Sequence, residues 1–451
     1  MIEELEAPLG LYWLNQALIR LESDVDVLTT EVDADLKLSR LAVLCHEYAH
    51  YLHNFSTRTG VYQFVAQLRL LRLFTHTVDK EGHCGGSARL SELASDQLAS
   101  TLLWFRHLTG TTVNSSQQRH IQLRTIDYAE PVTVKFANEA IALSPVTVDF
   151  YACDSGSIDP THTCTLGSHV ITEGLAWEVE RLVYQSVDES THVLDQRTPQ
   201  APYKLARCVF EGVAKCSPDS ETMAKILLLA LLSSDSGLTL VAIAKEMFNR
   251  GALSIEAAFE QFLQRTPTTQ YLDETIDLLK VEIKGFAQGG PAGRGIAALA
   301  QRSIDLLEAR KANLFFDIDA FKRIVEPGVL SELINQHPPC PILQVKGDST
   351  GLILLGAQNP DQSALNELGA AQAMLQFMWS HIDSSGIVQT NQARAQACRF
   401  HAICSVPAAK DPSSPCVKSP WENFERGMGE GCWYAAGVSC ARGYSEVSKD
   451  K

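Results

Sequence analysis

The chain of 451 residues lacks any long hydrophobic stretch. Its longest apolar run, residues 226–232, is far shorter than the roughly 20 residues that a membrane-spanning helix needs. Residues 1–6 are acidic and do not supply the basic and apolar segments of a secretory signal. These absences argue against a membrane protein and lead us to expect a cytoplasmic location.

Positive charge is also scarce, since 38 Lys and Arg face 53 Asp and Glu and give a formal net charge of −15. Proteins that bind nucleic acids use clustered positive charge to neutralise phosphates, so we expect no nucleic-acid partner. Internal repeats, low-complexity tracts and heptad arrays are absent. Hydrophobic residues make up 45% and charged residues 20%, which is typical of a globular chain whose length can hold more than one domain.

No C-x-x-C pair occurs among the twelve cysteines, so the strongest zinc-finger and redox patterns are missing. Without a secretory signal, we expect thiols or metal ligands before disulfides. Five cysteines lie in the last sixty residues, where Cys398, His401 and Cys404 place three metal-ligating side chains within seven positions. With Cys416 they form a candidate structural metal site, for zinc or for an iron–sulfur cluster. The alternative is a set of free thiols.

The most informative pattern is H-E-Y-A-H at residues 46–50, inside a helix predicted over about residues 36–54. Two imidazoles four residues apart share one helical face, so His46 and His50 can bind one metal ion through ring nitrogens. Glu47 can take a proton from a water molecule at the metal and return it to a leaving group. H-E-x-x-H is the signature of the zincins. The alternative is an ordinary core helix with hydrogen-bonded histidines.

The same helix does not supply a third ligand. His53 shares the face, but it lies about 10 Å along the axis from His46, too far for one ion with ligand bonds near 2 Å. We therefore expect His53 to support a ligand, to face substrate or to lie on the surface. The metzincin continuation, H-E-x-x-H-x-x-G-x-x-H, is absent because His53 and Ser56 occupy its last two fixed positions.

A better third ligand occurs in residues 172–176, which read T-E-G-L-A. This string resembles the N-E-G-x-A string of the gluzincin metallopeptidases in all but its first residue. The resemblance implies that Glu173 completes a zinc site with the two histidines of the motif. Small side chains at Gly174 and Ala176 would let this helix approach the motif helix closely. The alternative for Glu173 is a solvated glutamate favoured by the helix dipole.

The surroundings of this string agree only partly with the gluzincins. His169 precedes Glu173 by four residues and is a candidate to orient it or to donate a hydrogen bond to a reaction oxyanion. Many gluzincins carry an acidic residue four places after the ligand glutamate, where this chain has Trp177; Glu178 or Glu180 could substitute. The 122 residues between the second histidine and the glutamate are far more than compact members have.

We expect an α+β fold that is mostly helical, built on zincin-like metal-binding helices. Inserted strands are predicted at about 119–151, a β-hairpin at about 342–355, a helix over 11–21 and a strand over 25–32. The predicted parts of the chain are a zincin-like domain at 1–215, a helical domain at 216–390 and a Cys-rich segment at 391–451.

Together these features predict a zinc-dependent metallopeptidase that hydrolyses a peptide bond in a restricted peptide or protein substrate. His46, His50 and Glu173 would hold Zn²⁺, Glu47 would activate the zinc-bound water, and His169 is the second candidate catalytic residue. One alternative is a non-haem iron oxygenase, which uses the same two-histidine, one-carboxylate set. Another is a non-catalytic, zincin-derived binding protein. The sequence indicates no oligomeric state.

Overall fold

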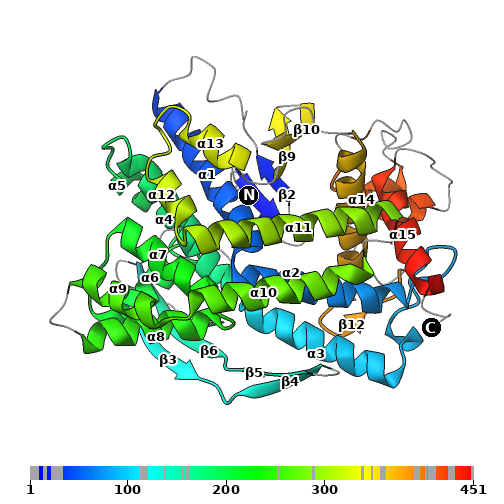
Figure 1. Cartoon of the computed structure of the whole chain (residues 1–451), viewed down its shortest axis with the longest axis horizontal. Coiled ribbons are helices and arrows are strands. Elements are labelled where there is room, and N and C mark those ends of the chain that lie inside the picture. The colour runs from blue at the N-terminus through cyan, green and yellow to red at the C-terminus, as the bar shows by residue number, and fades with distance from the viewer. Residues whose placement is uncertain are drawn as a thin grey trace.

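The computed structural model describes most of the chain. The described residues are 10–13, 18–21, 34–111, 120–136, 139–154, 157–158, 162–250, 254–286, 290–336, 340–346, 349–355, 362–390, 397–401, 404, 413–424 and 432–447. They form a mostly helical structure with small sheets, which confirms the expected α+β class (Figure 1).

Long helices form the centre of the molecule. They are α1 (Ala34–Ser56), α2 (Arg58–Thr75), α4 (Ser168–Gln185), α11 (Gly290–Ala312) and α14 (Gln362–Ser380). Helix α1 contacts α2, α4 and α11. A tight turn joins α1 to α2, where the Thr57 side chain accepts a hydrogen bond of 3.2 Å from the Gly60 N–H and caps α2. A Cβ at Gly60 would clash with the backbone of Asn54, so glycine is required at this close approach.

The other helices surround this centre. They are α3 (Glu92–Thr109), α5 (His192–Arg197), α6 (Leu205–Ala214), α7 (Ser220–Leu231), α8 (Ser236–Asn249), α9 (Ile255–Arg265), α10 (Thr268–Glu282), α12 (Phe316–Phe321), α13 (Val329–Gln336) and α15 (Trp433–Val447), with 3₁₀ turns η3 (Ser87–Arg89), η4 (Ile283–Gly285), η8 (Pro415–Val417) and η9 (Pro420–Phe424). Asp219, Asp235 and Ser254 cap α7, α8 and α9 by accepting hydrogen bonds from backbone N–H groups three residues later. The predicted helical character of residues 216–390 is confirmed.

One sheet joins strands near residue 20 to a hairpin more than 300 residues later. Its strands, in spatial order, are β1 (Gly10–Trp13), β2 (Leu18–Leu21), β9 (Cys340–Lys346) and β10 (Ser349–Leu355). β9 and β10 confirm the predicted hairpin, and β2 runs parallel to β9 with Ile19 opposite Ile342. The helix predicted over 11–21 is therefore wrong, because its apolar residues are buried as strands against a partner more than 300 residues away. The strand predicted over 25–32 lies outside the described residues.

Strands near residues 119–151 are confirmed between α3 and α4. They are β3 (His120–Tyr128), β4 (Val132–Phe136), β5 (Glu139–Leu143), β6 (Val146–Asp154), β7 (Ser157–Ile158) and β8 (His162–Thr165). β6 pairs with β3, β7 and β8, while β4 and β5 form a separate ribbon; β11 (Ile382–Asp383) and β12 (Gly386–Ile387) form another. The β3–β6 pair lies along the lower side of the molecule, whereas β2 and β9 lie near its top (Figure 1).

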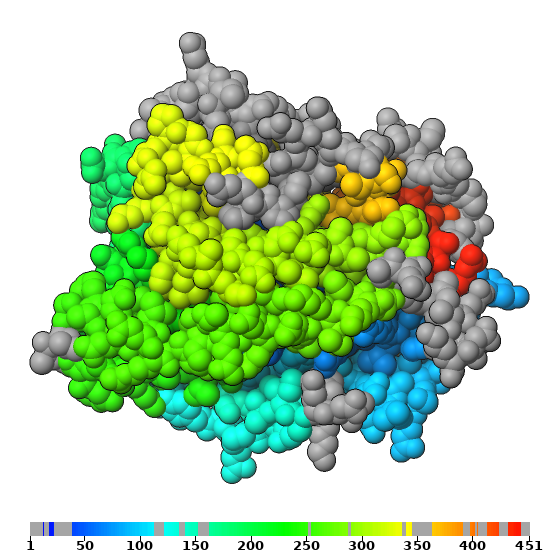
Figure 2. All heavy atoms as spheres, viewed as in Figure 1, coloured from blue at the N-terminus to red at the C-terminus, as the bar shows by residue number. Residues whose placement is uncertain are grey.

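One hydrophobic core extends across the expected boundary at residue 215. Buried apolar side chains from both sides of it belong to the same cluster, and α4 packs on α7 while α6 packs on α8. In the space-filling view, α10 and α11 form a continuous band over the middle of one face (Figure 2). None of the helices within the described ranges combines the length and apolar character of a membrane span.

Candidate metal centre

Helices α1 and α4 pack side by side and bring the two sequence motifs together. The apolar face of α1 is anchored by buried residues such as Leu44, Tyr48 and Leu52. The motif side chains are also largely buried, with His46 6% and His50 7% exposed. Buried polar groups are costly unless they have partners, so their surroundings decide what these histidines do.

The three expected ligand residues meet at one point. Nε2 of His46 and Nε2 of His50 lie 3.1 Å apart, and Oε2 of Glu173 lies 3.6 Å and 3.5 Å from them respectively. A tetrahedral zinc ion with ligand bonds of 2.0–2.1 Å separates its ligand atoms by about 3.3–3.4 Å. The three side chains therefore fit one zinc ion with little movement, and one coordination position stays open for water or substrate.

The charges around this point favour a cation. Burial disfavours the charged form of Glu173, but His50 and His46 outweigh this effect and hold its pKa well below the usual value. Burial likewise opposes a charge on His46, but Glu180, Glu173 and Glu47 raise its pKa well above the usual value. The carboxylates thus stabilise positive charge at the histidines. A divalent cation bound between these side chains would provide that positive charge.

Of the two acidic residues that the sequence left open, Glu180 is the one that lies beside the ligand group. Its Oε1 lies 2.5 Å from Nδ1 of His46, so the ring is held with Nε2 towards Glu173. Such an outer carboxylate fixes the orientation and tautomer of a ligand histidine. Glu180 reaches the site because it lies two helical turns after Glu173, and residues seven apart share a helical face.

Trp177 and Glu178, the other two positions considered after Glu173, have structural partners instead. Glu178 is fully buried, and its Oε1 accepts a hydrogen bond of 2.7 Å from Nε of Arg207. Trp177 is buried with the guanidinium of Arg181 over its ring at 4.8 Å. Neither side chain contacts the ligand group in the described structure.

Gly174 has a different role from the one expected. A Cβ there would meet Ala206 at 3.0 Å and the Tyr203 carbonyl oxygen at 3.4 Å, so the small residue admits the segment before α6, not α1. That approach brings the Tyr203 ring within 5.8 Å of the His46 ring. Burial, followed by the charges of Glu173 and two further glutamates, raises the pKa of Tyr203. No sequence pattern identified Tyr203.

The sequence also missed Tyr12, which comes from strand β1. Its ring stacks on that of His50, with centroids 6.1 Å apart and planes 11° apart. Its hydroxyl accepts a hydrogen bond of 2.8 Å from Nδ2 of Asn54, one turn further along α1. β1 is an edge strand of its sheet, so the edge of this sheet borders the second ligand.

Two expected catalytic side chains have unpartnered atoms. Oε2 of Glu47 and Nε2 of His169 are buried and make no hydrogen bond within the described residues. Burial raises the pKa of Glu47 against the opposing effect of His46 and His50. Burial lowers the pKa of His169, which favours its neutral form. A raised pKa makes the carboxylate of Glu47 a stronger base than that of an exposed glutamate, as general-base catalysis favours.

His53 serves a structural cluster. It is fully buried, and its Nε2 lies 2.7 Å from Oδ2 of Asp317. Arg310 donates to both oxygens of the same carboxylate, at 3.2 Å and 2.9 Å. The expectation that His53 faces substrate or lies on the surface is therefore wrong; it fastens the end of α1 to α11 and α12.

The predicted tail site is less compact. Among the described residues, His46, His50 and Glu173 form the group whose ligand atoms lie within 4.8 Å of one another. Cys398, His401, Cys404 and Cys416 do not gather so closely, although the Cys398 N–H donates to the Cys416 carbonyl at 2.8 Å.

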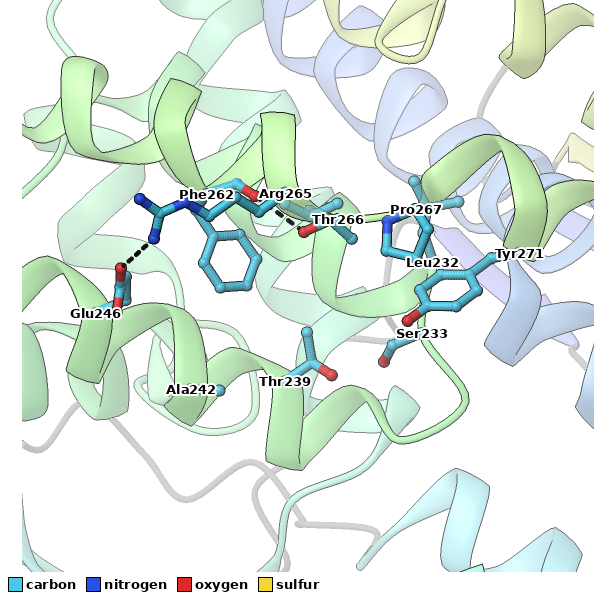
Figure 3. A pocket seen from close by; sticks show the side chains of 11 residues that line it. Leu232, Ser233, Thr239, Ala242, Glu246, Phe262, Arg265, Thr266, Pro267 and Tyr271 are labelled. Atoms are coloured by element: carbon cyan, nitrogen blue, oxygen red, sulfur yellow. Dashed lines mark hydrogen bonds and ion pairs between the residues drawn. The ribbon is translucent and has the colours of Figure 1, made fainter.

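A pocket of about 410 Å³ lies elsewhere, between α7, α8, α9 and α10 (Figure 3). Phe262 and Tyr271 line it, and Glu246 is paired with Arg265 at its rim. None of its lining residues belongs to the metal-binding group. It is therefore not the place where the chemistry of the motif would occur.

Comparisons with protein-family models, with curated proteins and with solved structures gave no match to this chain. Its function must therefore be inferred from the geometry of the α1–α4 site.

Proposed function

We propose that the chain is a zinc-dependent metallopeptidase of the zincin type, with His46, His50 and Glu173 as ligands. The observation that carries this proposal is the convergence of three ligand atoms 3.1–3.6 Å apart from two sequence motifs. Two histidines and one glutamate are an established catalytic zinc set. The unpartnered carboxylate of Glu47 on the same helix supports hydrolysis over mere metal storage.

A bound zinc ion would supply an electrophilic centre that polarises a carbonyl group and lowers the pKa of water. Glu47 would accept the proton of the attacking water at its free Oε2 and pass it to the leaving amine. The burial that raises the pKa of Glu47 helps it to hold that proton between the two steps. His169, held neutral by burial, would donate a hydrogen bond to the developing oxyanion.

The substrate would be a restricted peptide or protein. The motif histidines are largely buried, and Tyr12 and Tyr203 cover their rings, so access to the ligand group is limited. A site of this kind suits a chain segment that can be threaded between the two tyrosines. Rapid degradation of casein and of unrelated unfolded proteins by the purified enzyme would contradict this restriction.

The direct test combines metal analysis with a Glu47→Gln variant. We expect zinc at this site in the wild type and in Glu47→Gln, together with a loss of peptidase activity of about 10²–10⁴-fold in the variant. Glu189→Gln, at an exposed position, is the matched control and should keep full activity. Iron at the site, or turnover that survives in Glu47→Gln, would overturn the proposal.

A further inference from the structure

The C-terminal part of the chain brings four cysteines together from three short segments. The Cys398 N–H donates to the Cys416 carbonyl oxygen at 2.8 Å, which pairs the first and second segments. The rings of Phe400 and Trp433 lie 4.8 Å apart and edge to face, which places the start of α15, and so Cys432, against the first segment. Two backbone hydrogen bonds keep Cys404 in the first segment: the His401 N–H donates to the Cys398 carbonyl oxygen, and the Cys404 N–H donates to the His401 carbonyl oxygen.

The sulfur atoms of this group receive N–H donors, as thiolates do in metal sites. Nδ2 of Asn423 donates to Sγ of Cys416 at 3.0 Å, and the Ala435 N–H points at Sγ of Cys432 at 3.4 Å. The backbone of Phe400 provides a similar donor to Cys398. Hydrogen bonds of this kind stabilise negative charge on sulfur and tune bound metals.

The four thiols also act on one another electrostatically. Cys398 interacts electrostatically with Cys432, Cys416 and Cys404, which places the other three sulfur atoms near it. Cys432 interacts in the same way with Cys404 and Cys416. The four sulfur atoms therefore share one neighbourhood, which a metal ion or cluster that favours thiolate ligands can bridge.

We propose that Cys398, Cys404, Cys416 and Cys432 hold a second, structural metal centre of soft-metal chemistry, a zinc ion or an iron–sulfur cluster. This set replaces His401 of the sequence-based prediction with Cys432. All four cysteines are free thiols in the structure, so no disulfide competes for them. In the described residues no three of these sulfur atoms lie within 4.8 Å of one another. A single zinc ion would therefore need the sulfur atoms to move closer together, whereas an iron–sulfur cluster, which is larger, would need a smaller movement.

The centre would fasten the tail to the helical core. Gln376 of α14 donates to the Ala397 carbonyl oxygen at 2.8 Å and accepts from the Arg399 N–H at 3.2 Å, so the first cysteine segment is already attached to α14. Between β12 and α15, the described residues form only short 3₁₀ turns. A metal that links them supplies the stability that such short elements lack.

The test is the metal content of the full chain, purified without chelators, for wild type and for single Cys→Ser variants at the four positions. We expect each variant to lose one zinc equivalent, or all iron together with its visible absorption, while the zinc of the α1–α4 site stays bound. Glu173→Ala should show the opposite loss, so failure here is distinct from failure of the proposed peptidase site. Metal content equal to wild type in all four variants would overturn the proposal.

Cys440→Ser and His401→Ala are the matched controls. Cys440 lies on α15 beside Gly290, and we expect its variant to keep both metals. His401→Ala should also keep both, and loss of the tail metal in that variant would refute the four-cysteine set. If a Cys→Ser variant does not fold, stepwise titration of the wild type with an organomercurial provides the second readout. Metal release in step with four thiols would support the centre, and thiol modification without metal release would refute it.

Discussion

Two clusters of histidine and carboxylate lie one helical turn apart on α1. In one, His46 and His50 face Glu173 and Glu180; in the other, His53 faces Asp317. The second cluster contains its own cation, because Arg310 donates to both oxygens of Asp317. Within the described residues, the salt-bridge partners of Glu173 and Glu180 are histidines alone.

The comparison separates a histidine with a structural role from the two histidines that we propose as metal ligands. The histidines of both clusters are buried, and both clusters join α1 to another helix, so residue type and the burial of the histidine do not distinguish them. The side chains of Glu173 and Glu180 are 20% and 15% exposed, whereas that of Asp317 is fully buried. The difference is whether the protein balances the carboxylate with a guanidinium. Where it does, the cluster is complete and serves packing; where it does not, a metal ion can complete it.

The largest expected effect concerns the completed cluster. Arg310→Met leaves the fully buried Asp317 without its cation, and removing one partner of a buried pair costs about 3–5 kcal/mol of stability. Arg323→Met removes an exposed pair with Glu326 and should cost less than about 1 kcal/mol. Denaturant unfolding of both variants measures the difference. Equal losses would mean that Arg310 does not balance a buried charge on Asp317, and would remove the feature by which the two clusters are distinguished.

The next effect concerns the incomplete cluster. Added Zn²⁺ at 100 times its Kd should raise the free energy of unfolding by about 2.7 kcal/mol, because the ion binds only the folded site. The gain should disappear in Glu173→Ala and persist in His53→Asn. Thermal unfolding with and without zinc measures it. A zinc-dependent gain that survives in Glu173→Ala would assign the stabilising ion to another site.

A smaller effect tests the outer carboxylate. Glu180→Gln keeps the size of the side chain but removes the charge beside Nδ1 of His46, so zinc affinity should fall about 10–100-fold. Competition with a chromophoric chelator gives the affinity, and Glu189→Gln serves as the exposed control. Unchanged affinity would mean that Glu180 does not orient the ligand.

The smallest effect is a pH dependence of stability. Burial lowers the pKa of His53 in the folded state, despite the opposing effect of Asp317. The unfolded chain therefore binds a proton that the folded chain does not, and His53 makes stability fall as pH drops below about 6.5. His53→Asn should reduce the slope of stability against pH between about 7 and 5. Identical slopes in the variant and wild type would contradict the assignment.

Local patterns in the sequence predicted much of the site. The pairing of His46 with His50 follows from helical spacing, and Glu173 was expected because the string around it resembles that of the gluzincins; the structure brings the three ligand atoms together. Tyr12, Tyr203 and Glu180 were missed or left open. Their places depend on which helices and strands pack together, and one-dimensional spacing does not contain that information.

The same limit explains the error at the N-terminus. Leu18, Ile19 and Leu21 form an apolar run that fits a helix or a strand, and only the distant β9 decides between them. The hairpin of β9 and β10 was predicted because its partners are adjacent in sequence. His53 was misjudged for the same reason, since Asp317 lies 264 residues away.

The parallel pairing of β2 with β9 sets an order of events during synthesis. The three proposed ligands of the α1–α4 site lie before residue 174, so they leave the ribosome well before β9 is made. Tyr12, which covers His50, lies on a strand held by β2, and β2 gains its second neighbour only when residues 340–346 emerge. A nascent chain thus carries these three residues long before β9 is available to hold the strands that bear their cover.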